Sequence, residues 1–265
     1  MTLDKKQKGP TTQKGEGAGS YWRHFKVSMT GSKVGDVANF SLPPVMTCNR
    51  EAPCIDDGCY AVKAVGIYPT SRISQEVNYA LLKGGAYKQF EEEIGKVLAL
   101  SKKNGDGTKS PRFEYFRFFV SGDMISHDML NSICNIATSH SNIKFWMYTK
   151  QYKILHEHTG AIPSNLTILV SCWGKFNPKM YIPKGMKVEN DENGNPIAPY
   201  ADLAERFPLA YLDDNTAETR SYFEKKSGDE VCPCTDDDEV VARCDTCHKC
   251  FSVRANKGNI IFKKH

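Results

Sequence analysis

Three apolar stretches decide the fold: FEYFRFFV at 113–120, IKFWMY at 143–148 and LTILVSC at 166–172. Each is a near-continuous apolar run of strand length, which is typical of strands that are covered on both faces of a parallel sheet. Segments with helical character lie between them, at 126–139 and 150–158. This alternation predicts a parallel sheet with crossover helices. We therefore expect an α/β fold, with an incomplete (β/α) barrel as the most economical architecture.

The flanking segments add further expected elements. Short alternating apolar stretches predict a hairpin or two entry strands within 25–41, and helical periodicity predicts helices at 71–83 and 86–103. The Asn193-Gly194 pair predicts an inserted hairpin within 186–200. The remaining expected elements are a strand at 207–212, a helix at 217–226 and a short strand at 259–262.

Composition divides the chain into three expected parts. Residues 1–20 are rich in Gly, Thr, Lys and Gln, and they predict a flexible basic arm that is either a solubilising tail or a contact for nucleic-acid phosphates. Residues 21–228 would form the partial barrel, including a cysteine loop near its N-terminus. Residues 229–265 would form a cysteine-rich metal-binding module. The net charge of +4 is too weak to indicate nucleic-acid binding by itself.

The ten cysteines indicate metal rather than disulfides. No apolar run reaches transmembrane length and no signal-peptide core follows Met1, so we expect a cytoplasmic protein without a membrane partner. Disulfides are rare in that reducing compartment. The spacing of the cysteines must then decide which metal they bind.

The C-terminal cysteine group reads VCPCTDDDEVVARCDTCHKCF at 231–251. Cys244, Cys247 and Cys250 have C-x2-C-x2-C spacing, and Cys232 and Cys234 lie upstream beside a proline. Three sulfurs on a tight turn with a distant fourth are typical of ferredoxin-type clusters. We therefore predict an iron–sulfur cluster of the 4Fe-4S type. A zinc ion, which also takes four sulfurs, is the alternative.

The N-terminal cysteine group reads TCNREAPCIDDGCYA at 47–61. Cys48, Cys54 and Cys59 have C-x5-C-x4-C spacing, and no fourth cysteine is nearby. Three ligands would leave one iron of a four-iron cluster open to a small molecule. The alternatives are a zinc knuckle that a distant ligand such as Cys172 completes, or a cluster with four protein ligands.

Polar residues follow each of the three strands, at the ends where barrel enzymes carry their chemistry. Asp123 could hold an ammonium group and Lys150 an anionic ligand, and with Cys172 they are the candidate catalytic residues. Taken singly, each turn could instead be an ordinary helix cap. The polar residues are Ser121, Gly122 and Asp123 after the first strand, Thr149 and Lys150 after the second, and Ser171, Cys172 and Trp173 at the third.

These motifs resemble a known family. TCNREAPCIDDGCYAVKA, RFFVSGDM, FWMYTK, LVSCW and CP…CDTCHKCF, in this order over roughly residues 30–251, resemble the phage gene-product-88-like proteins. They are also distantly similar to radical S-adenosylmethionine barrel proteins, although the first cysteine spacing is not the C-x3-C-x2-C of those enzymes. The resemblance implies a phage origin, hence the host cytoplasm, and it favours Cys232 over Cys234 as the fourth ligand.

The similarity to radical enzymes implies a cofactor site as well. Their Gly-Gly-Glu-type motif after the second strand binds the amine of S-adenosylmethionine, and residues 121–123 occupy the corresponding place. We list Ser121, Gly122, Asp123, Thr149 and Lys150 as candidate cofactor-binding residues.

Two functions are open at this stage. The first is a redox or radical enzyme, possibly dependent on S-adenosylmethionine, with one or two iron–sulfur clusters and a nucleotide, nucleic acid or small metabolite as substrate. The second is a non-catalytic module, stabilised by zinc or iron–sulfur, that binds nucleic acid or a host protein.

Overall fold

The structure is a computed structural model, and it describes residues 21–31, 34–233 and 242–264. The predicted basic arm at 1–20 and the candidate ligand Cys234 lie outside the described residues.

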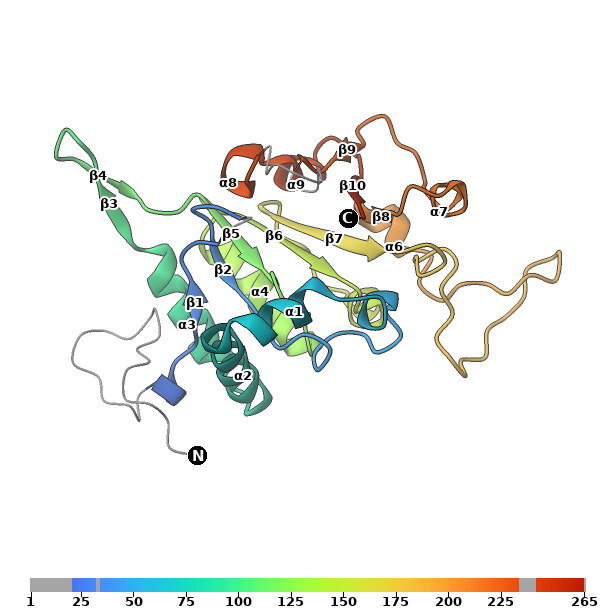
Figure 1. Cartoon of the computed structure of the whole chain (residues 1–265), viewed down its shortest axis with the longest axis horizontal. Helices are drawn as coiled ribbons and strands as arrows, with labels where there is room; N and C mark the ends of the chain where they lie inside the picture. Colours follow the sequence, from blue (N-terminus) through green and yellow to red (C-terminus); the bar gives the residue numbers. More distant parts are fainter. Residues whose placement is uncertain (1–20, 32–33, 234–241, 265) are drawn as a thin grey trace.

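One eight-stranded sheet forms the centre of the molecule (Figure 1). Only β1 is antiparallel to its neighbour, and all other pairs of adjacent strands are parallel. The strands β2, β5, β6, β7, β8 and β10 are neighbours in the sheet in the same order as in the chain. The short strand β9 is the exception, because it precedes β10 in the chain but lies beyond it at the edge of the sheet. In spatial order the strands are β1 (Val27–Ser28), β2 (Ala38–Phe40), β5 (Tyr115–Phe118), β6 (Lys144–Thr149), β7 (Leu166–Cys172), β8 (Leu209–Asp213), β10 (Ile260–Lys263) and β9 (Glu230–Val231).

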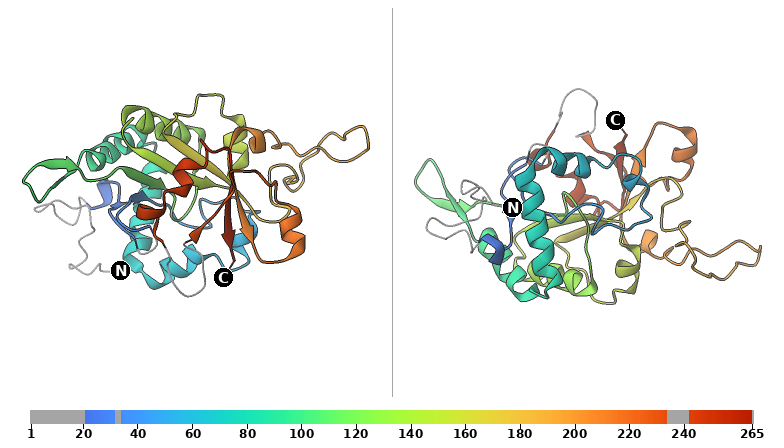
Figure 2. Two further views of the ribbon diagram at one scale, coloured as in Figure 1. Left: turned by 90° about the horizontal axis from the view of Figure 1, so that it is seen from above. Right: turned by 60° about the horizontal axis from the view of Figure 1, so that its bottom comes forward.

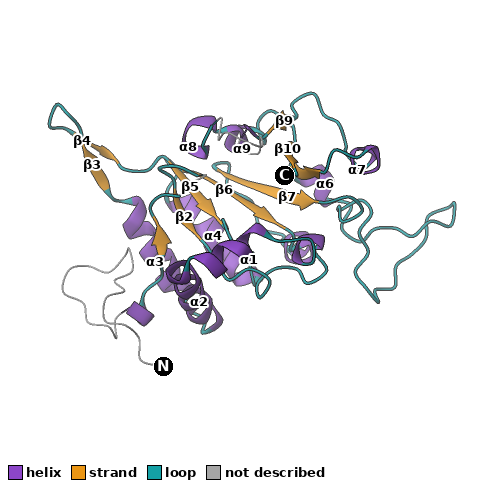
Figure 3. Cartoon of the chain, viewed as in Figure 1, coloured by secondary structure: helices purple, strands orange, loops and turns teal. Residues whose placement is uncertain are grey.

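Helices occupy most of the connections between these strands (Figure 3). In the long connection between β7 and α6, 173–202, the structure has isolated bridges only, and this segment extends away from the sheet. The α-helices are α1 (Tyr60–Ile67), α2 (Pro69–Lys83), α3 (Tyr87–Leu98), α4 (His127–Ser139), α5 (Tyr152–Glu157), α6 (Leu203–Arg206), α7 (Ala217–Ser221), α8 (Cys244–Cys247) and α9 (Lys249–Ser252). Two short 3-10 helices lie at Tyr21–Arg23 and Pro53–Ile55.

The two faces of the sheet have different covers. In β5, Phe116 and Phe118 point into the large core that α3 and α4 cover, while Tyr115 and Arg117 point to the opposite face because side chains alternate along a strand. On that opposite face the buried cluster includes Trp146, and α8 and α9 lie over it (Figure 2). The C-terminal cysteines thus lie on the face of the sheet that the larger helices leave uncovered.

The structure confirms most of the expected elements. The three apolar stretches are the adjacent parallel strands β5, β6 and β7, and the two entry strands pair as β1 and β2. The predicted cap Ser126 accepts a hydrogen bond from the amide of Met129 at the start of α4. The stretch at 259–262 is confirmed as β10, which is part of the main sheet.

One expectation was wrong, and two were met only in coarse form. The helix predicted to continue to residue 103 ends at Leu98, and the chain then forms a separate hairpin of β3 (Ser101–Lys103) and β4 (Lys109–Pro111). The hairpin expected within 186–200 is present in minimal form, since the chain reverses around Asn193-Gly194 with one isolated antiparallel bridge, Asn190 to Pro196. The α/β fold with a mostly parallel sheet is confirmed, but among the described residues the sheet is open, with β1 and β9 as its edges, and an incomplete barrel stays a prediction.

Turn chemistry explains why the helix ends at Leu98 and is followed by a hairpin. The residues Asn104–Gly107 form a hairpin turn, in which the amide of Asn104 donates to the Thr108 carbonyl and the Asp106 carboxylate accepts from the Thr108 amide. These bonds reverse the chain and pair its lysine-rich flanks as strands. Within the described residues, no helix is both long and apolar enough to cross a membrane.

Candidate functional site

The turn after β5 is pressed against the loop that carries the first cysteine. Gly122 has a φ of 73°, and a Cβ added there would lie 2.5 Å from the carbonyl oxygen of Leu42 and 2.7 Å from Oγ1 of Thr47. Only glycine combines this backbone conformation with so close an approach. The turn therefore places residues 121–123 directly beside Thr47 and Cys48.

Asp123 joins three segments of the chain. Its Oδ2 accepts a hydrogen bond from the amide of Lys150 at 2.7 Å, and its Oδ1 accepts one from the amide of Met124 at 2.8 Å. Its own amide donates to Oγ1 of Thr47 at 3.0 Å. The side chain is buried, and burial raises the pKa of Asp123 to about 6 despite these hydrogen bonds and the nearby Lys150 ammonium.

The three candidate catalytic residues lie together at the strand ends, and Cys48 lies with them. Burial, followed by the Asp123 carboxylate, raises the pKa of Cys48 to about 12, and Lys150 opposes that rise. Burial also raises the pKa of Cys172 to about 12, against a hydrogen bond from Tyr152 and the charge of Lys150. The Lys150 ammonium is thus close enough to act on both sulfurs, although these residues are separated by up to 124 positions in the chain.

The other candidate cofactor residues make internal hydrogen bonds. The hydroxyl of Ser121 donates to Oε1 of Gln75 at 3.3 Å, and Oγ1 of Thr149 accepts from the amide of Gln151 at 2.9 Å. Both hydroxyls are buried. These hydrogen bonds hold the strand ends together, and binding of a cofactor by these groups stays a prediction.

Side chains that the sequence did not single out hold the first cysteine loop in place. The amide nitrogen of Asn49 donates to the Lys150 carbonyl at 3.1 Å, and that of Gln151 donates to the Thr47 carbonyl at 2.8 Å. No sequence pattern marks such bonds, because they join residues that are about a hundred positions apart.

The first cysteine group is only partly gathered. Cys54 packs against the main core and is close enough to Cys48 to influence its pKa, while Cys59 is the residue that precedes α1. All three cysteines are half-buried and unpaired by disulfides. The next residue, Tyr60, donates its hydroxyl proton to the Val120 carbonyl at the end of β5, which ties this loop to the sheet.

The C-terminal cysteines lie on the opposite face of the sheet. Cys232, Cys244 and Cys250 all pack against the cluster that contains Trp146. Burial raises the pKa of Cys250 to about 12, and the nearby Cys232 and Cys244 thiolates would add to this rise. A hydrogen bond with Tyr148 acts in the opposite direction. The Tyr148 hydroxyl lies 2.7 Å from the Cys250 sulfur.

A left-handed residue shapes the turn between the last two helices. His248, with a φ of 58°, separates α8 from α9 and so sets the positions of Cys247 and Cys250. Its ring stacks on Tyr115 at 4.2 Å between centroids, and its Nε2 bonds to the carbonyl of Asp245. In this conformation His248 is a packing residue.

Two buried donors beside these cysteines have no acceptor. Nε of Arg117 and Nε1 of Trp146 are buried and without a hydrogen-bond partner among the described residues. Burial by itself lowers the pKa of Arg117, but Tyr60, Tyr148, Cys244 and Cys250 more than offset this effect. A positive charge among sulfurs suits anionic metal–thiolate groups, so the donor set and its surroundings fit such a group.

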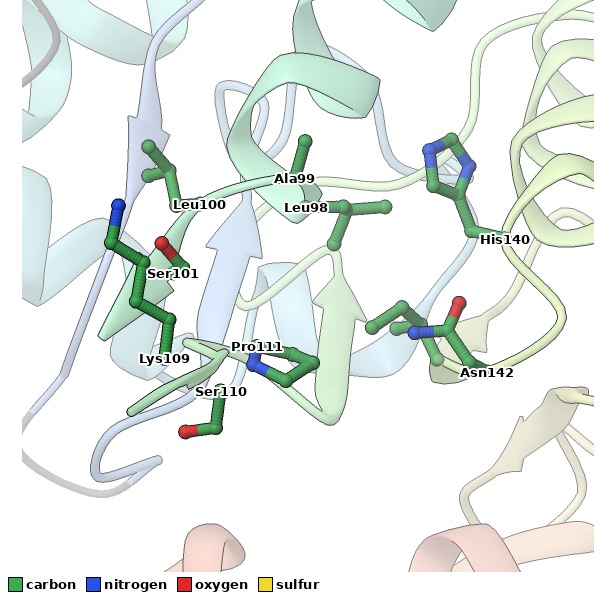
Figure 4. A pocket seen from close by; sticks show the side chains of 10 residues that line it. Leu98, Ala99, Leu100, Ser101, Lys109, Ser110, Pro111, His140 and Asn142 are labelled. Carbon is green, nitrogen blue, oxygen red and sulfur yellow. The ribbon is translucent and has the colours of Figure 1, made fainter. Parts of the chain in front are cut away.

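The cysteines are not arranged as a finished metal site. Within the described residues, no three Cys, His, Asp or Glu side chains are grouped so that they could hold one ion. A cavity of about 380 Å³ lies elsewhere, where α3 ends beside the β3–β4 hairpin (Figure 4). It is lined by residues such as Lys109, Pro111, His140 and Asn142, and none of the candidate site residues contributes to it.

The fold and these side chains define a mixed α/β protein with one cysteine group at the strand ends of a mostly parallel sheet and a second on its open face. The chain belongs to the gene product 88 family, whose model matches residues 2–253. This match confirms the family that the motifs resemble, while similarity to radical S-adenosylmethionine proteins stays a prediction. No curated protein and no solved structure matches the chain.

Proposed function

We propose that this protein binds iron–sulfur clusters through its two cysteine groups and uses the first for redox or radical chemistry. The observation that carries the proposal is the packing of Cys232, Cys244 and Cys250 against one buried cluster, where Cys244 and Cys250 lie close enough to Arg117 to act on its charge. Among the described residues, Arg117 has no carboxylate partner. Neutral thiols would leave that charge uncompensated, whereas metal-bound thiolates would balance it.

The C-terminal group would be the electron-transfer site. Cys244, Cys247 and Cys250 would provide three ligands and Cys232 the fourth, after side-chain rotations that bring the sulfurs to one centre. When bound, the cluster would accept and pass on single electrons. The chain's own contribution is to exclude water with Phe251 and the sheet face.

The N-terminal group would be the site of chemistry. Cys48, Cys54 and Cys59 would leave one iron open, and Asp123, Lys150 and Cys172 lie beside Cys48. In this role Lys150 would pair with an anionic group, such as a nucleotide phosphate or the carboxylate of S-adenosylmethionine.

The topology supports the interpretation of the sheet as part of a barrel. Parallel strands in chain order with the larger helices on one face are what an incomplete, radical-enzyme-like (β/α) barrel requires. Residues 121–123 would then approach the substrate side of the cluster from the end of β5. Nucleotides, nucleic acid and small metabolites are the substrate classes we propose.

Metal analysis of anaerobically purified protein tests the proposal. We expect a brown protein with about four iron and four sulfide ions per cluster. A Cys244→Ser/Cys250→Ser variant should lose the iron and sulfide of one cluster. Cys134→Ser is the matched control, because Cys134 is buried in α4 and packs in the other core. A colourless protein that contains only zinc would contradict the proposal and favour the non-catalytic binding module.

A second experiment addresses the chemistry of the first group. Adding S-adenosylmethionine to dithionite-reduced protein should change the paramagnetic resonance spectrum and release methionine and 5′-deoxyadenosine. The reductant provides the electron that cleaves the carbon–sulfur bond, and the substrate or a buffer component provides the hydrogen atom that the 5′-deoxyadenosyl radical takes up. A Cys48→Ser/Cys59→Ser variant should lose both effects and keep the C-terminal cluster. An iron-loaded protein that shows neither effect would refute the radical mechanism.

A further inference from the structure

The sheet face under the C-terminal cysteines carries three side-chain donors. Arg117 comes from β5, and Trp146 and Tyr148 come from β6. The guanidinium carbon of Arg117 lies 5.2 Å from the centre of the Tyr148 ring and 5.8 Å from that of Trp146, so the three form one continuous patch. We refer to Arg117, Trp146 and Tyr148 as the donor surface.

The donor surface is incompletely paired, with Trp146 fully buried and Arg117 and Tyr148 half-buried. Nε of Arg117 and Nε1 of Trp146 have no acceptor among the described residues, and Trp146 is completely inaccessible to solvent. Native proteins rarely leave buried donors unpaired, and such groups indicate an acceptor that is not part of the polypeptide. The third donor, the Tyr148 hydroxyl, already lies 2.7 Å from the sulfur of Cys250.

Among residues 21–31, 34–233 and 242–264, no acidic side chain is paired with the positive charge of this surface. In this part of the chain Arg117 forms no ion pair with a carboxylate, and Cys244 and Cys250 are among the groups that act on its charge. A buried cation interacts more strongly with nearby charge than an exposed one does, because little water screens it. Any gain of negative charge at the cysteines is therefore stabilised here.

We propose that the donor surface stabilises the reduced state of the C-terminal cluster and so raises its reduction potential. This inference rests on the proposed function. The step is the gain of one electron from an added reductant, with no bond formed or broken, and it makes the cluster more negative. Charge and hydrogen bonds at the sulfurs are known determinants of cluster potentials. Arg117 is a positioning residue in this sense, since it acts through the cluster.

The position of the donor surface gives this effect a direction. Val120 packs against the same buried cluster and accepts the hydrogen bond from Tyr60, the residue after Cys59. The donor surface therefore lies between the C-terminal cysteines and the first cysteine loop. A C-terminal cluster with a raised potential would accept electrons readily and be a weaker reductant, so the donor surface favours electron flow from the first site towards the C-terminal cluster.

Redox titration of the full-length anaerobic protein with dithionite, followed by absorption and paramagnetic resonance, tests the inference. For Arg117→Gln we expect roughly a tenfold lower ratio of reduced to oxidised C-terminal cluster at a given potential, about 59 mV for a one-electron couple. Arg117→Lys keeps the charge and should shift by less than half as much. Tyr148→Phe, which removes only the hydroxyl beside Cys250, should also lower the potential.

Lys249 provides the matched control. Its ammonium is close enough to Cys232 and Cys247 to respond to them, but it is over one-third exposed and paired with Glu230 at 2.7 Å. Lys249→Gln should therefore change the potential much less than Arg117→Gln, because solvent and Glu230 already compensate the charge.

The outcomes separate the two proposals. A wild-type protein without iron and sulfide refutes the proposed function. Iron-loaded Arg117→Gln and Tyr148→Phe proteins that both titrate like the wild type refute the donor surface and leave the cluster intact. If Arg117→Gln does not fold, the Tyr148→Phe and Arg117→Lys titrations decide: an unchanged potential in Tyr148→Phe overturns the inference, and a lowered one supports it.

Discussion

Gly122 and Asp123 show how single residues hold the strand ends together. The glycine permits the close approach of the turn to Leu42 and Thr47, and the buried carboxylate of Asp123 accepts the amides of Met124 and Lys150. The sequence marked both residues as ligand-binding candidates. Their contacts in the structure are internal, so any ligand would add to an arrangement that already stabilises the fold.

Substitution of Gly122 should destabilise the protein more than backbone strain alone explains. In Gly122→Ala, the new Cβ would meet the Leu42 carbonyl at 2.5 Å in addition to the strain of a positive φ. Gly185→Ala is the control, because Gly185 has a φ of 79° and no atom within 4 Å of the added Cβ. Denaturant titration should give a loss of about 1–2 kcal/mol for Gly185→Ala and about 1–3 kcal/mol more for Gly122→Ala. Equal losses would mean that the close contact has no cost.

His158 should make stability depend on pH. Burial, followed by the charges of Arg206 and His127, lowers the pKa of His158 below its ordinary value of 6.5. The folded protein therefore keeps this ring neutral, and the unfolded chain binds the proton first as the pH falls. The free energy of unfolding should drop below about pH 6.5, and His158→Gln should show a smaller drop. Parallel pH profiles for the two proteins would contradict this assignment.

Elements with strong periodicity could be predicted from the sequence, and elements made by turns could not. The apolar runs of β5, β6 and β7 and the periodicity of α3 and α4 carry their own signal. The β3–β4 hairpin has no apolar face, so its lysine-rich strands look like the end of a helix until the bonds around Thr108 are seen. The donor surface could have been predicted from one feature of the sequence, the charged Arg117 within the apolar run at 113–120.

The caps of α4 and α7 should contribute differently to stability. Ser126 and Thr216 each accept an amide hydrogen bond at 3.1 Å, from Met129 and Thr219. Because α4 is a 13-residue helix with seven buried residues and α7 has only five residues, α7 can unfold locally. Ser126→Ala should lower the global free energy of unfolding by about 1 kcal/mol.

Thr216→Ala should leave the global value nearly unchanged and instead raise hydrogen exchange in 217–221. An equal global loss for both variants would show that α7 unfolds only together with the core.

At the scale of the whole molecule, the C-terminal segment is part of the main sheet. β10 pairs in parallel with β8, and Phe251 of α9 lies 4.1 Å from Trp146 between ring centroids. Arg254 donates to the carbonyls of Pro163 and Leu166 near the start of β7. The cysteine spacing predicts metal binding in this segment. Its packing on β6 and β7 could not be predicted, because these contacts join residues more than eighty positions apart and no local sequence pattern marks them.

Removal of 229–265 should therefore unfold more than the segment itself. Trp146 and Leu169 would lose their cover, and β8 would become an exposed edge with unpaired backbone groups. We expect the truncated chain to lose its cooperative thermal transition and to show red-shifted tryptophan emission. Phe251→Ala is the milder comparison, and it should keep the fold at a cost of about 2–3 kcal/mol, since this ring is only partly buried. A truncated chain that melts cooperatively at the full-length temperature would show that the sheet is stable without β10, and that the cysteines of α8 and α9 dock on a face that is already formed.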